Sequence, residues 1–470
     1  MNEGKVHGCY CNNNSCGLFY LPKFVENKIT TIIQEETMTI LEKARAGEIT
    51  AEMIYVAQKE GIDPELIRQG VAAGEIVILM STRPNINPVA VGKGLFTKVS
   101  ASVGMYEVDD TIAGEMAKID QAVKAKADTL MDLSVRGPID AMRETVLSTV
   151  DRPVGTLPLY QTLAMAQEKY GTALDMTADD MFAMMEKHAA EGVSFLALHC
   201  GTTMDVINRA KEEGRIDPLV SYGGSHLIGW MVHNHCENPF FTQYDRVLEI
   251  CKKYDVVLSF ADGMRPGCIA DSLDGAQVHE LVILGGLVKK ARAAGVQVMV
   301  KGPGHVPLDQ IQTTVSLQKQ LCGGAPYFVF GCLPTDSGAG MDHVTGAIGG
   351  AIASYYGADF LCYVTPAEHI GMPSADDVYL GVMASRIAAH AGDVGKGHPA
   401  AIAWDLEMSH ARRELNWGRQ MELAIDTETA TKVWKDRSTN FESECSMCGD
   451  FCAMKIVGKY LRDENQEARN

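Results

Sequence analysis

Short apolar, β-branched runs alternate with amphipathic helical stretches along most of the chain. Eight such runs are predicted to be strands, at residues 129–134, 154–160, 193–200, 219–223, 256–262, 296–302, 327–332 and 360–365. Most are separated by roughly 20 to 40 residues, which leaves room for one helix between neighbours. Because the runs are apolar throughout, we expect both faces of the sheet to be buried. This pattern predicts a parallel (β/α)8 TIM barrel of the α/β class, with a doubly wound sheet as the alternative.

Other segments extend this plan at both ends of the chain. Helical spacing is found over residues 28–57 and 65–73, and a short strand is predicted at 75–80. Apolar helices are expected at 276–294, where Gly285 would allow close packing on the sheet, and at 344–358, which we expect to be buried. Further helices are predicted at 375–395, 405–425 and 427–436.

These elements divide the chain into four expected parts. They are a flexible cysteine-containing tail at 1–25, a small α+β domain at 26–95, the catalytic barrel at 96–395 and a helical extension at 396–470 that carries a cysteine loop.

Charge and composition narrow the classes of function. The net charge of −18 argues against a general nucleic-acid or anionic-membrane surface. No apolar run is long enough to cross a bilayer, and the N-terminus has no apolar signal core. We therefore expect a cytoplasmic protein whose 13 cysteines are thiols or metal ligands rather than disulfides.

Three cysteines near the C-terminus carry the strongest chemical signal. Cys445, Cys448 and Cys452 have the spacing C-x2-C-x3-C, which suits a soft metal or an iron–sulfur cluster. A closed zinc site needs four ligands, and no fourth Cys or His follows before Asn470. Three cysteines on a four-iron cluster leave one iron open for a reactant, as S-adenosylmethionine radical chemistry requires. A zinc site completed by a distant His or Cys is the alternative.

A second group of cysteines lies at the other end of the chain. Cys9, Cys11 and Cys16 are spaced C-x-C-x4-C in a Gly- and Asn-rich segment. A second metal site is one interpretation, and a tail with free thiols is the favoured one.

In a barrel, the residues that follow the strands face one active-site mouth. Nearly every predicted strand ends in polar, metal-binding or Gly-rich sequence. His305 and His369 follow the sixth and eighth predicted strands, so a shared divalent metal is geometrically possible, although a lone buried histidine is more often a core residue. The Gly-rich turns at 223–224 and 302–304, together with Arg265, can bind a phosphate or can be turns alone.

Several motifs together resemble a known family. The motifs are Gly-Met-Arg-Pro-Gly at 263–267, Gly-Pro-Gly-His-Val-Pro at 302–307, the segment 361–369 and the cysteine stretch 445–452. They are similar to those of the phosphomethylpyrimidine synthases, radical S-adenosylmethionine enzymes, over about residues 35 to 455. The resemblance implies a barrel with a small N-terminal domain and a C-terminal cluster domain. It also implies a homodimer, because in the family the cluster loop reaches the active site of the partner subunit.

The resemblance also implies cofactors and site residues. A 4Fe-4S cluster on Cys445, Cys448 and Cys452 would pass one electron, from a donor such as flavodoxin or ferredoxin, to S-adenosylmethionine. Zinc or iron would be held by His305 and His369. The expected contacts to the substrate, aminoimidazole ribotide, are Ser102, Met131, Tyr160, His199, Ser221, Tyr222, Gly223, Asp262, Gly263, Met264, Arg265, Lys301 and Phe328.

Departures from the family pattern lie at this expected pocket. The chain has Ser-Ala-Ser-Val-Gly at 100–104 for the family's Asn-Ala-Asn-Ile-Gly, Tyr222 for Arg, Lys301 for Glu and Phe328 for Tyr, and its last cysteine gap is three residues where long members have four. Exchanging a carboxylate for an ammonium, or Arg for Tyr, changes the charge and hydrogen bonding of a pocket.

The departures favour a paralogue with the same initiation chemistry and a different rearrangement. We expect a radical S-adenosylmethionine carbon–carbon lyase that converts aminoimidazole ribotide into 5-hydroxybenzimidazole, the base of the cobalamin lower ligand, in an anaerobic pathway. A divergent enzyme that makes hydroxymethylpyrimidine phosphate for thiamine is the first alternative. A non-catalytic barrel with zinc on its cysteines is the second.

Overall fold

The computed structural model describes residues 38–107, 109–437 and 445–461. The chain separates into two units, Met1–Met38 and Thr39–Asn470, and the elements below belong to the second unit. The expectations for the tail at 1–25, with Cys9, Cys11 and Cys16, lie outside the described residues.

Eight parallel strands close into a barrel in the order β10-β3-β4-β5-β6-β7-β8-β9, so the predicted (β/α)8 fold is confirmed. The strands are β3 (Lys98–Val103), β4 (Thr129–Asp132), β5 (Val154–Thr156), β6 (Phe195–Leu198), β7 (Val257–Phe260), β8 (Val298–Lys301), β9 (Tyr327–Phe330) and β10 (Phe360–Cys362). The ring is completed by β10, which pairs with β9 on one side and β3 on the other.

In the barrel, one predicted strand was wrong and one real strand was missed. Residues 219–223 form a loop and the start of α9 (Tyr222–His233), where Ser221 caps the helix by accepting a hydrogen bond from the Gly224 amide. The missed strand is β3, whose sequence alternates small polar and apolar residues. Val99, Ala101 and Val103 pack toward the outer core, while the serines between them occupy the other face. Because its inner face is polar, β3 lacks the continuous apolar run by which the other strands were predicted.

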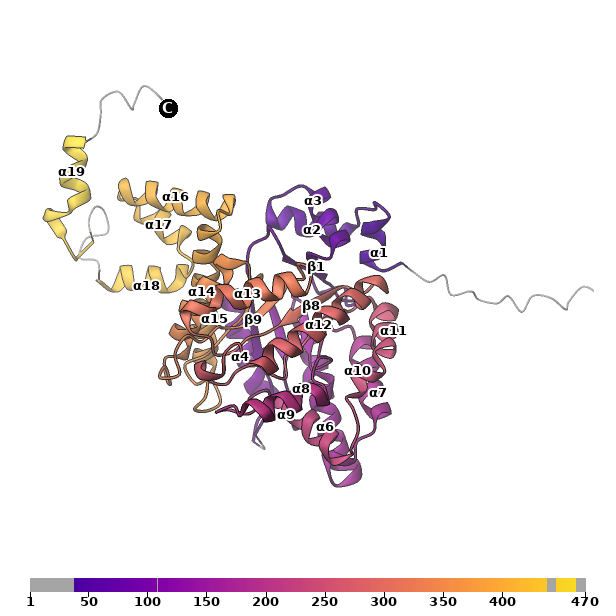
Figure 1. Cartoon of the computed structure of the whole chain (residues 1–470). Helices are drawn as coiled ribbons and strands as arrows, with labels where there is room; N and C mark the ends of the chain where they lie inside the picture. Colours follow the sequence, from indigo (N-terminus) through magenta and orange to yellow (C-terminus); the bar gives the residue numbers. More distant parts are fainter. Residues whose placement is uncertain (1–37, 108, 438–444, 462–470) are drawn as a thin grey trace, which may run out of the picture. The chain divides into compact units, whose positions relative to one another are not determined.

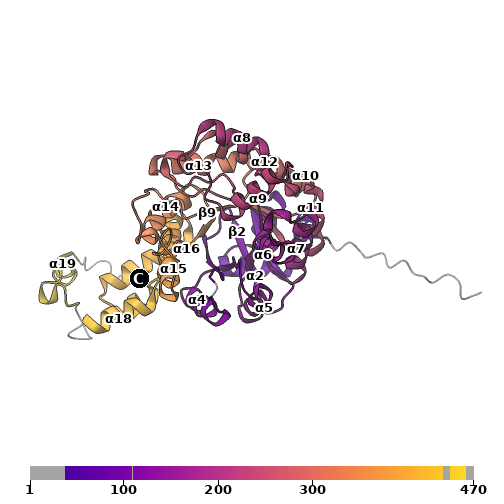
Figure 2. The same cartoon turned by 90° about the horizontal axis from the view of Figure 1, so that it is seen from below.

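Helices surround the strands, as Figure 2 shows. They are α4 (Ile112–Lys124), α5 (Ile139–Thr149), α6 (Pro158–Tyr170), α7 (Ala178–Ala190), α8 (Met204–Glu213), α9, α10 (Pro239–Thr242), α11 (Tyr244–Tyr254), α12 (Gly275–Ala293), α13 (Leu308–Leu321), α14 (Asp342–Tyr356) and α15 (Ala375–Gly395), with short 3-10 turns η1 (Ala173–Asp175) and η2 (Ile269–Asp271). The largest hydrophobic cluster fills the space between these helices and the outer face of the strands.

Two of the predicted apolar helices pack differently from expectation. Gly285 on α12 does approach a neighbour closely, but a Cβ there would lie 2.4 Å from the carbonyl oxygen of Leu321 in α13, not against the sheet. The predicted buried helix is α14, and one face of it is open because Val344 is 46% and Ile348 is 49% exposed. Glycines on the opposite face of α14 pack against the strands and α15.

The N-terminal elements close the end of the barrel at which the strands begin. They are α1 (Ile40–Arg45), α2 (Ala51–Glu60), α3 (Pro64–Ala73) and the antiparallel pair β1 (Ile76–Leu79) and β2 (Val89–Gly92) (Figure 1). The expected continuous helix is broken between α1 and α2, where Gly47 adopts φ +87°. Val77, Leu79 and Val91 join a cluster with interior residues such as Phe195 and Phe360. This end of the barrel is therefore filled, which leaves the carboxyl ends of the strands for a site.

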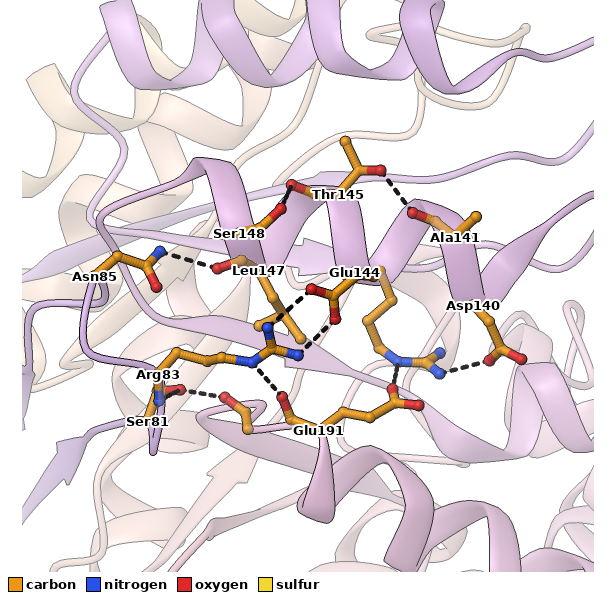
Figure 3. A network of polar contacts seen from close by, with 12 residues as sticks. Ser81, Arg83, Asn85, Asp140, Ala141, Glu144, Thr145, Leu147, Ser148 and Glu191 are labelled. Carbon is orange, nitrogen blue, oxygen red and sulfur yellow. Dashed lines mark hydrogen bonds and ion pairs between the residues drawn. The ribbon is translucent and has the colours of Figure 1, made fainter.

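A polar network ties the loop after β1 to the barrel helices (Figure 3). Arg83 donates two hydrogen bonds to Glu144 on α5 and one to the backbone carbonyl of Glu191, which ends α7. Arg143, whose side chain is fully buried, pairs with the carboxylates of Glu191 and Asp140. A buried guanidinium is tolerated only with such partners, so the network fixes α5 against α7.

The C-terminal extension is helical, as predicted. Its elements are α16 (Pro399–Arg413), α17 (Trp417–Leu423), α18 (Thr427–Arg437), η3 (Gly449–Phe451) and α19 (Ala453–Leu461). The single helix expected at 405–425 is split, because Leu415 adopts φ +56° and Asn416 caps α17. Among the described residues, no helix has the length and apolar character needed to cross a membrane.

Candidate active site

A cavity of about 250 Å³ opens at the carboxyl ends of the strands. Of the residues expected from the sequence to contact substrate or metal, those that line it are Ser102, Tyr160, Asp262, Arg265, Lys301 and His369. Tyr106, Glu115, Lys118, Phe330, Cys362 and Glu368 also line the cavity. The barrel therefore brings residues from all around the sheet to one mouth, as the fold requires.

His305 and His369 converge at the edge of this mouth. Their Nε2 atoms lie 3.2 Å apart. On the far side of each ring, Nδ1 of His305 lies 2.7 Å from Asp336 and Nδ1 of His369 lies 3.5 Å from Asp342. Burial lowers the pKa of His305, and Asp336 opposes that shift. A carboxylate behind each imidazole directs the Nδ1 proton outward and leaves the Nε2 lone pair for a cation.

The pair fits a divalent metal in its donor chemistry and spacing. Two nitrogens bound tetrahedrally at about 2.0–2.1 Å from zinc would be separated by about 3.3 Å, close to the 3.2 Å between these Nε2 atoms. In the described ranges, no group of three or more His, Cys, Asp or Glu side chains could hold a metal ion. A metal here would thus have two protein ligands and open positions for water or substrate.

Asp262 and Glu280 define the wall of the site after β7. Asp262 is 7% exposed, and neither carboxylate oxygen has a hydrogen-bond partner. Glu280, from α12, accepts hydrogen bonds from the amides of Gly263 and Met264 and from the hydroxyl of Thr202. Burial raises the pKa of Glu280 to about 7. Glu280 therefore holds the turn that presents Asp262 and Arg265.

His199, Ser221 and Gly223 form a second, tightly packed wall. His199 Nε2 lies 3.0 Å from the hydroxyl of Ser221, and its Nδ1 is buried without a partner. Burial, with help from two nearby cations, lowers the pKa of His199 to about 3, so the ring is neutral at ordinary pH. A Cβ at Gly223 would lie 2.5 Å from His199 Cε1 and 3.0 Å from Tyr160 Cε1. Only glycine fits this position without moving both rings.

Aromatic rings surround the two cations of the cavity. The Lys301 ammonium lies 4.7 Å from the centroid of Phe328, and the Arg265 guanidinium lies 4.9 Å from that of Phe330. Phe328 itself is 1% exposed and stacks on Phe360 below the cavity. Met131 is likewise fully buried. Both belong to the floor under the cavity and are not among its lining residues.

Tyr222 lies at the outer part of the same region. Its ring meets Tyr160 edge-on at 5.0 Å and Tyr106 at 6.4 Å, and it is 40% exposed. The expected substrate contacts at Tyr222, Gly263 and Met264 remain predictions. The expected contacts at the wall residues Asp262, His199, Ser221 and Gly223 also remain predictions.

The C-terminal cysteines are not assembled into a site in the described structure. Cys445, Cys448 and Cys452 are free thiols, with Cys448 exposed. Cys452 directly precedes α19, and η3 occupies the gap between Cys448 and Cys452. The donor set and its spacing suit a cluster with one open iron, and none of the three residues lines the cavity of its own chain.

Sequence reasoning missed Glu280 and Asp342 and assigned Asp336 no role. Glu280 carried a detectable signal, because Ala276, Glu280 and Leu284 share one buried face of α12. A single carboxylate on an apolar helix face requires hydrogen-bond donors opposite it. Asp342 begins α14 and gave no comparable signal, since an acidic residue is ordinary in a first helical turn.

Comparisons with known proteins agree with this architecture and site. The model of the radical SAM ThiC family matches residues 39–459. The chain is 76% identical to 5-hydroxybenzimidazole synthase BzaA of Eubacterium limosum, over 91% of this chain and all of that protein. It is 60% identical to the BzaA of Moorella thermoacetica, over 90% of this chain and 98% of that protein. It is 53% identical to a phosphomethylpyrimidine synthase of Desulforamulus reducens, over 91% and 99% respectively.

These matches identify the barrel as an enzyme of the radical S-adenosylmethionine type. The chain belongs to the radical SAM ThiC family. Membership implies S-adenosylmethionine and an iron–sulfur cluster as cofactors.

Proposed function

We propose that this enzyme is a carbon–carbon lyase that converts aminoimidazole ribotide into 5-hydroxybenzimidazole. The observation that carries the proposal is the 76% identity, over 91% of the chain, to a protein named for that product. The ammonium of Lys301 inside the cavity supports it, because a phosphomethylpyrimidine-type pocket is expected to have a carboxylate there. Product analysis by mass spectrometry tests it, as described at the end of the Discussion.

We propose separate roles for the three cysteines, the two histidines and the other residues of the site. Cys445, Cys448 and Cys452 would hold the cluster, which with S-adenosylmethionine supplies the initiating radical. His305 and His369 would hold zinc or iron, whose open positions would orient a substrate or cofactor oxygen or nitrogen. The remaining residues would bind the substrate and exclude water from it, which is the main task of a site that confines a radical.

Within the substrate pocket, His199 and Asp262 have the clearest roles. His199 has an unpartnered buried Nδ1, and Asp262 has two unpartnered oxygens. Buried polar atoms without partners are costly unless a ligand satisfies them. We infer that the aminoimidazole and sugar hydroxyl groups of the ribotide supply those partners.

We also propose a homodimer in which the cysteine loop of one subunit serves the cavity of the other. The support is that none of the three cysteines lines the cavity of its own chain. The open face of α14 and α15, with Val344, Ile348, Leu380 and Ile387 each at least 46% exposed, offers apolar surface for such a contact. We propose a cytoplasmic location, with which the free thiols of the ten described cysteines agree. As the electron donor we propose a protein such as flavodoxin or ferredoxin.

The alternative product is hydroxymethylpyrimidine phosphate. The 53% identity, over 91% of the chain, to a protein named phosphomethylpyrimidine synthase favours it. The difference between the two proposals lies in the pocket residues rather than in the fold. Family membership argues against the non-catalytic zinc barrel. The boundaries 26–95, 96–395 and 396–470 stay as proposed divisions of the chain.

A further inference from the structure

A second cavity, of about 480 Å³, lies at the end of the barrel where the strands begin, between the N-terminal elements and α15. Residues at the start of three neighbouring strands line it, at 97–99 for β3, 126–128 for β4 and 151–152 for β5. Its size is within the range of small-molecule sites, about 300–1,000 Å³. Among the described residues, none lines both this cavity and the active-site cavity.

Buried charges with partners inside the protein fix the walls of this second cavity. The ammonium of Lys98 lies 2.9 Å from the carboxylate of Glu60 on α2, and the two side chains are 7% and 6% exposed. Asp393 on α15 accepts hydrogen bonds from the amide and the hydroxyl of Thr97 and pairs with Lys396. These contacts hold α2 and α15 to the first residues of β3, so the cavity has rigid walls.

Arg386 on α15 and Asp128 before β4 line the same cavity and have bonding capacity left over. The guanidinium of Arg386 donates to oxygen through Nη1 alone, to the backbone carbonyls of Ala125 and Ile425. One oxygen of Asp128 accepts a hydrogen bond from the Val99 amide at 2.7 Å. Within the described ranges, neither side chain has an ion-pair partner at 4.0 Å or less.

Each of these two charges is nonetheless in the field of the other. Burial raises the pKa of Asp128, and the charges of Lys98 and Arg386 oppose that shift. Burial lowers the pKa of Arg386, and the charge of Asp128 opposes that shift in turn. A molecule that offers an anionic group to Arg386 and an N–H donor to Asp128 would compensate both ions at once.

The remaining lining of the cavity narrows the kind of molecule. Tyr55, Phe96 and Trp404 contribute aromatic surface, and other residues of α2 and β2 contribute aliphatic surface. The lysines Lys59 and Lys126 also line the cavity but are exposed, so water compensates their charge. Charges of both signs beside apolar surface suit a zwitterion with an apolar substituent better than an ion of one sign.

Two lining residues connect the cavity to the C-terminal extension. Nε1 of Trp404 on α16 donates a hydrogen bond to the carbonyl of Leu423, and Arg386 donates to the carbonyl of Ile425. Both carbonyls belong to the short connection between α17 and α18. A ligand that binds the guanidinium and packs on the indole would restrict both side chains, and would thereby stabilise their bonds to this connection.

We propose that this cavity binds a free α-amino acid with an apolar side chain. The carboxylate of the amino acid binds Arg386, its ammonium binds Asp128, and its side chain lies against Phe96 and Trp404. Occupancy stabilises the connection between α17 and α18, and with it the extension that continues to the three C-terminal cysteines. The site is independent of which product the enzyme makes.

Calorimetry on the full-length protein tests the site without turnover. L-Leucine, L-methionine and L-phenylalanine are titrated, each beside its decarboxylated amine and its N-acetyl derivative. We expect at least one of the three amino acids to bind with a Kd below about 1 mM, and its two derivatives to bind at least roughly tenfold more weakly. If none of the three binds at concentrations up to about 10 mM, the proposal is wrong.

Substitutions assign the binding to this cavity. Arg386→Gln should lose the preference for the amino acid over the amine, and Asp128→Asn should lose the preference over the N-acetyl derivative, because each removes one charge. Arg209→Gln, which changes an exposed arginine on α8 that pairs with Glu213, is the matched control and should bind as wild type does.

Binding that survives both cavity substitutions and is displaced by S-adenosylmethionine would place the amino acid in the active site and overturn the proposal. Circular dichroism checks that the variants fold. Arg386→Lys keeps the positive charge and should keep the preference over the amine, so it decides the question if Arg386→Gln does not fold.

Hydrogen exchange tests the coupling to the extension. With the amino acid bound, we expect the amides of residues 417–437 to exchange at least roughly twofold more slowly in wild type. Trp404→Phe keeps an aromatic wall but removes the donor to Leu423, so it should bind the amino acid and slow the exchange less. Unchanged exchange in wild type at saturation would contradict the coupling.

Discussion

The Nε2 atoms of His305 and His369 face each other at 3.2 Å, and a carboxylate lies behind each ring. If Asp336 and Asp342 each accept an Nδ1 proton, two lone pairs point at one another. Such an arrangement is stable only with a cation between the nitrogens or with an extra proton on one ring. The geometry therefore favours a two-histidine metal site across β8 and β10, which are separated by β9 alone.

Changing His305 to Ala should remove the metal. The variant leaves one histidine, and the described residues near the pair provide no third His, Cys, Asp or Glu ligand to replace it. We expect the zinc plus iron content outside the cluster to fall from about one per chain to near zero by metal analysis. His279→Ala, a change to a half-buried histidine on α12 that pairs with Asp205, is the control. Unchanged metal content in His305→Ala would rule out this site.

Changing Cys448 to Ala should abolish radical initiation and leave the barrel folded. Cys448 is exposed and contributes nothing to the hydrophobic core. With only two thiolates left, we expect iron and sulfide to fall after anaerobic reconstitution and 5′-deoxyadenosine to drop below detection. Cys236→Ala, at a cysteine on the outer side of the barrel core, should retain both. If Cys448→Ala still forms deoxyadenosine, Cys448 is not a cluster ligand, and zinc without sulfide in wild type would contradict the cluster altogether.

Changing Gly223 to Ala should weaken substrate binding more than it weakens folding. The added Cβ would lie 2.5 Å from His199 Cε1, so the imidazole or the Tyr160 ring must move. We expect the affinity for aminoimidazole ribotide to fall by about tenfold or more, measured by calorimetry. Gly229→Ala lies on the same helix, α9, where a Cβ meets nothing within 4 Å, and should bind as wild type does. Equal affinities of the two variants would show that His199 and Tyr160 do not contact the substrate.

The pH dependence of stability should show that the pKa of Glu280 is raised in the folded protein. Its pKa is 4.5 in the unfolded chain and is raised by burial to about 7 in the folded one. Between these values the folded protein holds a proton that the unfolded chain has lost, so stability from this group is complete below 4.5 and declines as pH rises toward 7.

Glu280→Gln cannot titrate, so its stability relative to wild type should improve as the pH rises through that window. Urea midpoints of both proteins, measured in parallel, give the difference. A difference that stays constant would show that folding leaves the pKa of Glu280 unchanged, and a change in the opposite direction would show that folding lowers this pKa.

Sequence patterns predicted the barrel because seven of its eight strands lie within predominantly apolar runs of the sequence. The eighth, β3, was missed because its inner face carries serines, of which Ser102 lines the cavity. Strand order made it possible for His305 and His369 to meet, since the strands before them are two apart in the ring. The resemblance to the family, rather than strand order, implied that the two form a pair. The partners Asp336 and Asp342 lie in the connection from β9 to the start of α14, and no periodicity in the sequence records the path of that connection.

The pocket illustrates the same limit. Lys301 was recognised in the sequence as an unusual charge at a strand end, but its relation to Arg265 could not be seen there. Their shared aromatic neighbour, Phe330, arises from the register of β8 against β9. Likewise, Gly223 was predicted on a strand, whereas its place in the first turn of α9 is what presses it against His199. The sequence shows which residue types are present, whereas only the fold shows which of these residues lie close together.

One measurement tests the central claim most directly. Anaerobically reconstituted enzyme is incubated with a reductant, S-adenosylmethionine and aminoimidazole ribotide, and the products are identified by mass spectrometry. We predict 5-hydroxybenzimidazole together with free phosphate and 5′-deoxyadenosine. Hydroxymethylpyrimidine phosphate in its place would contradict the account and would show that Lys301 and Tyr222 are tolerated in a thiamine-pathway enzyme.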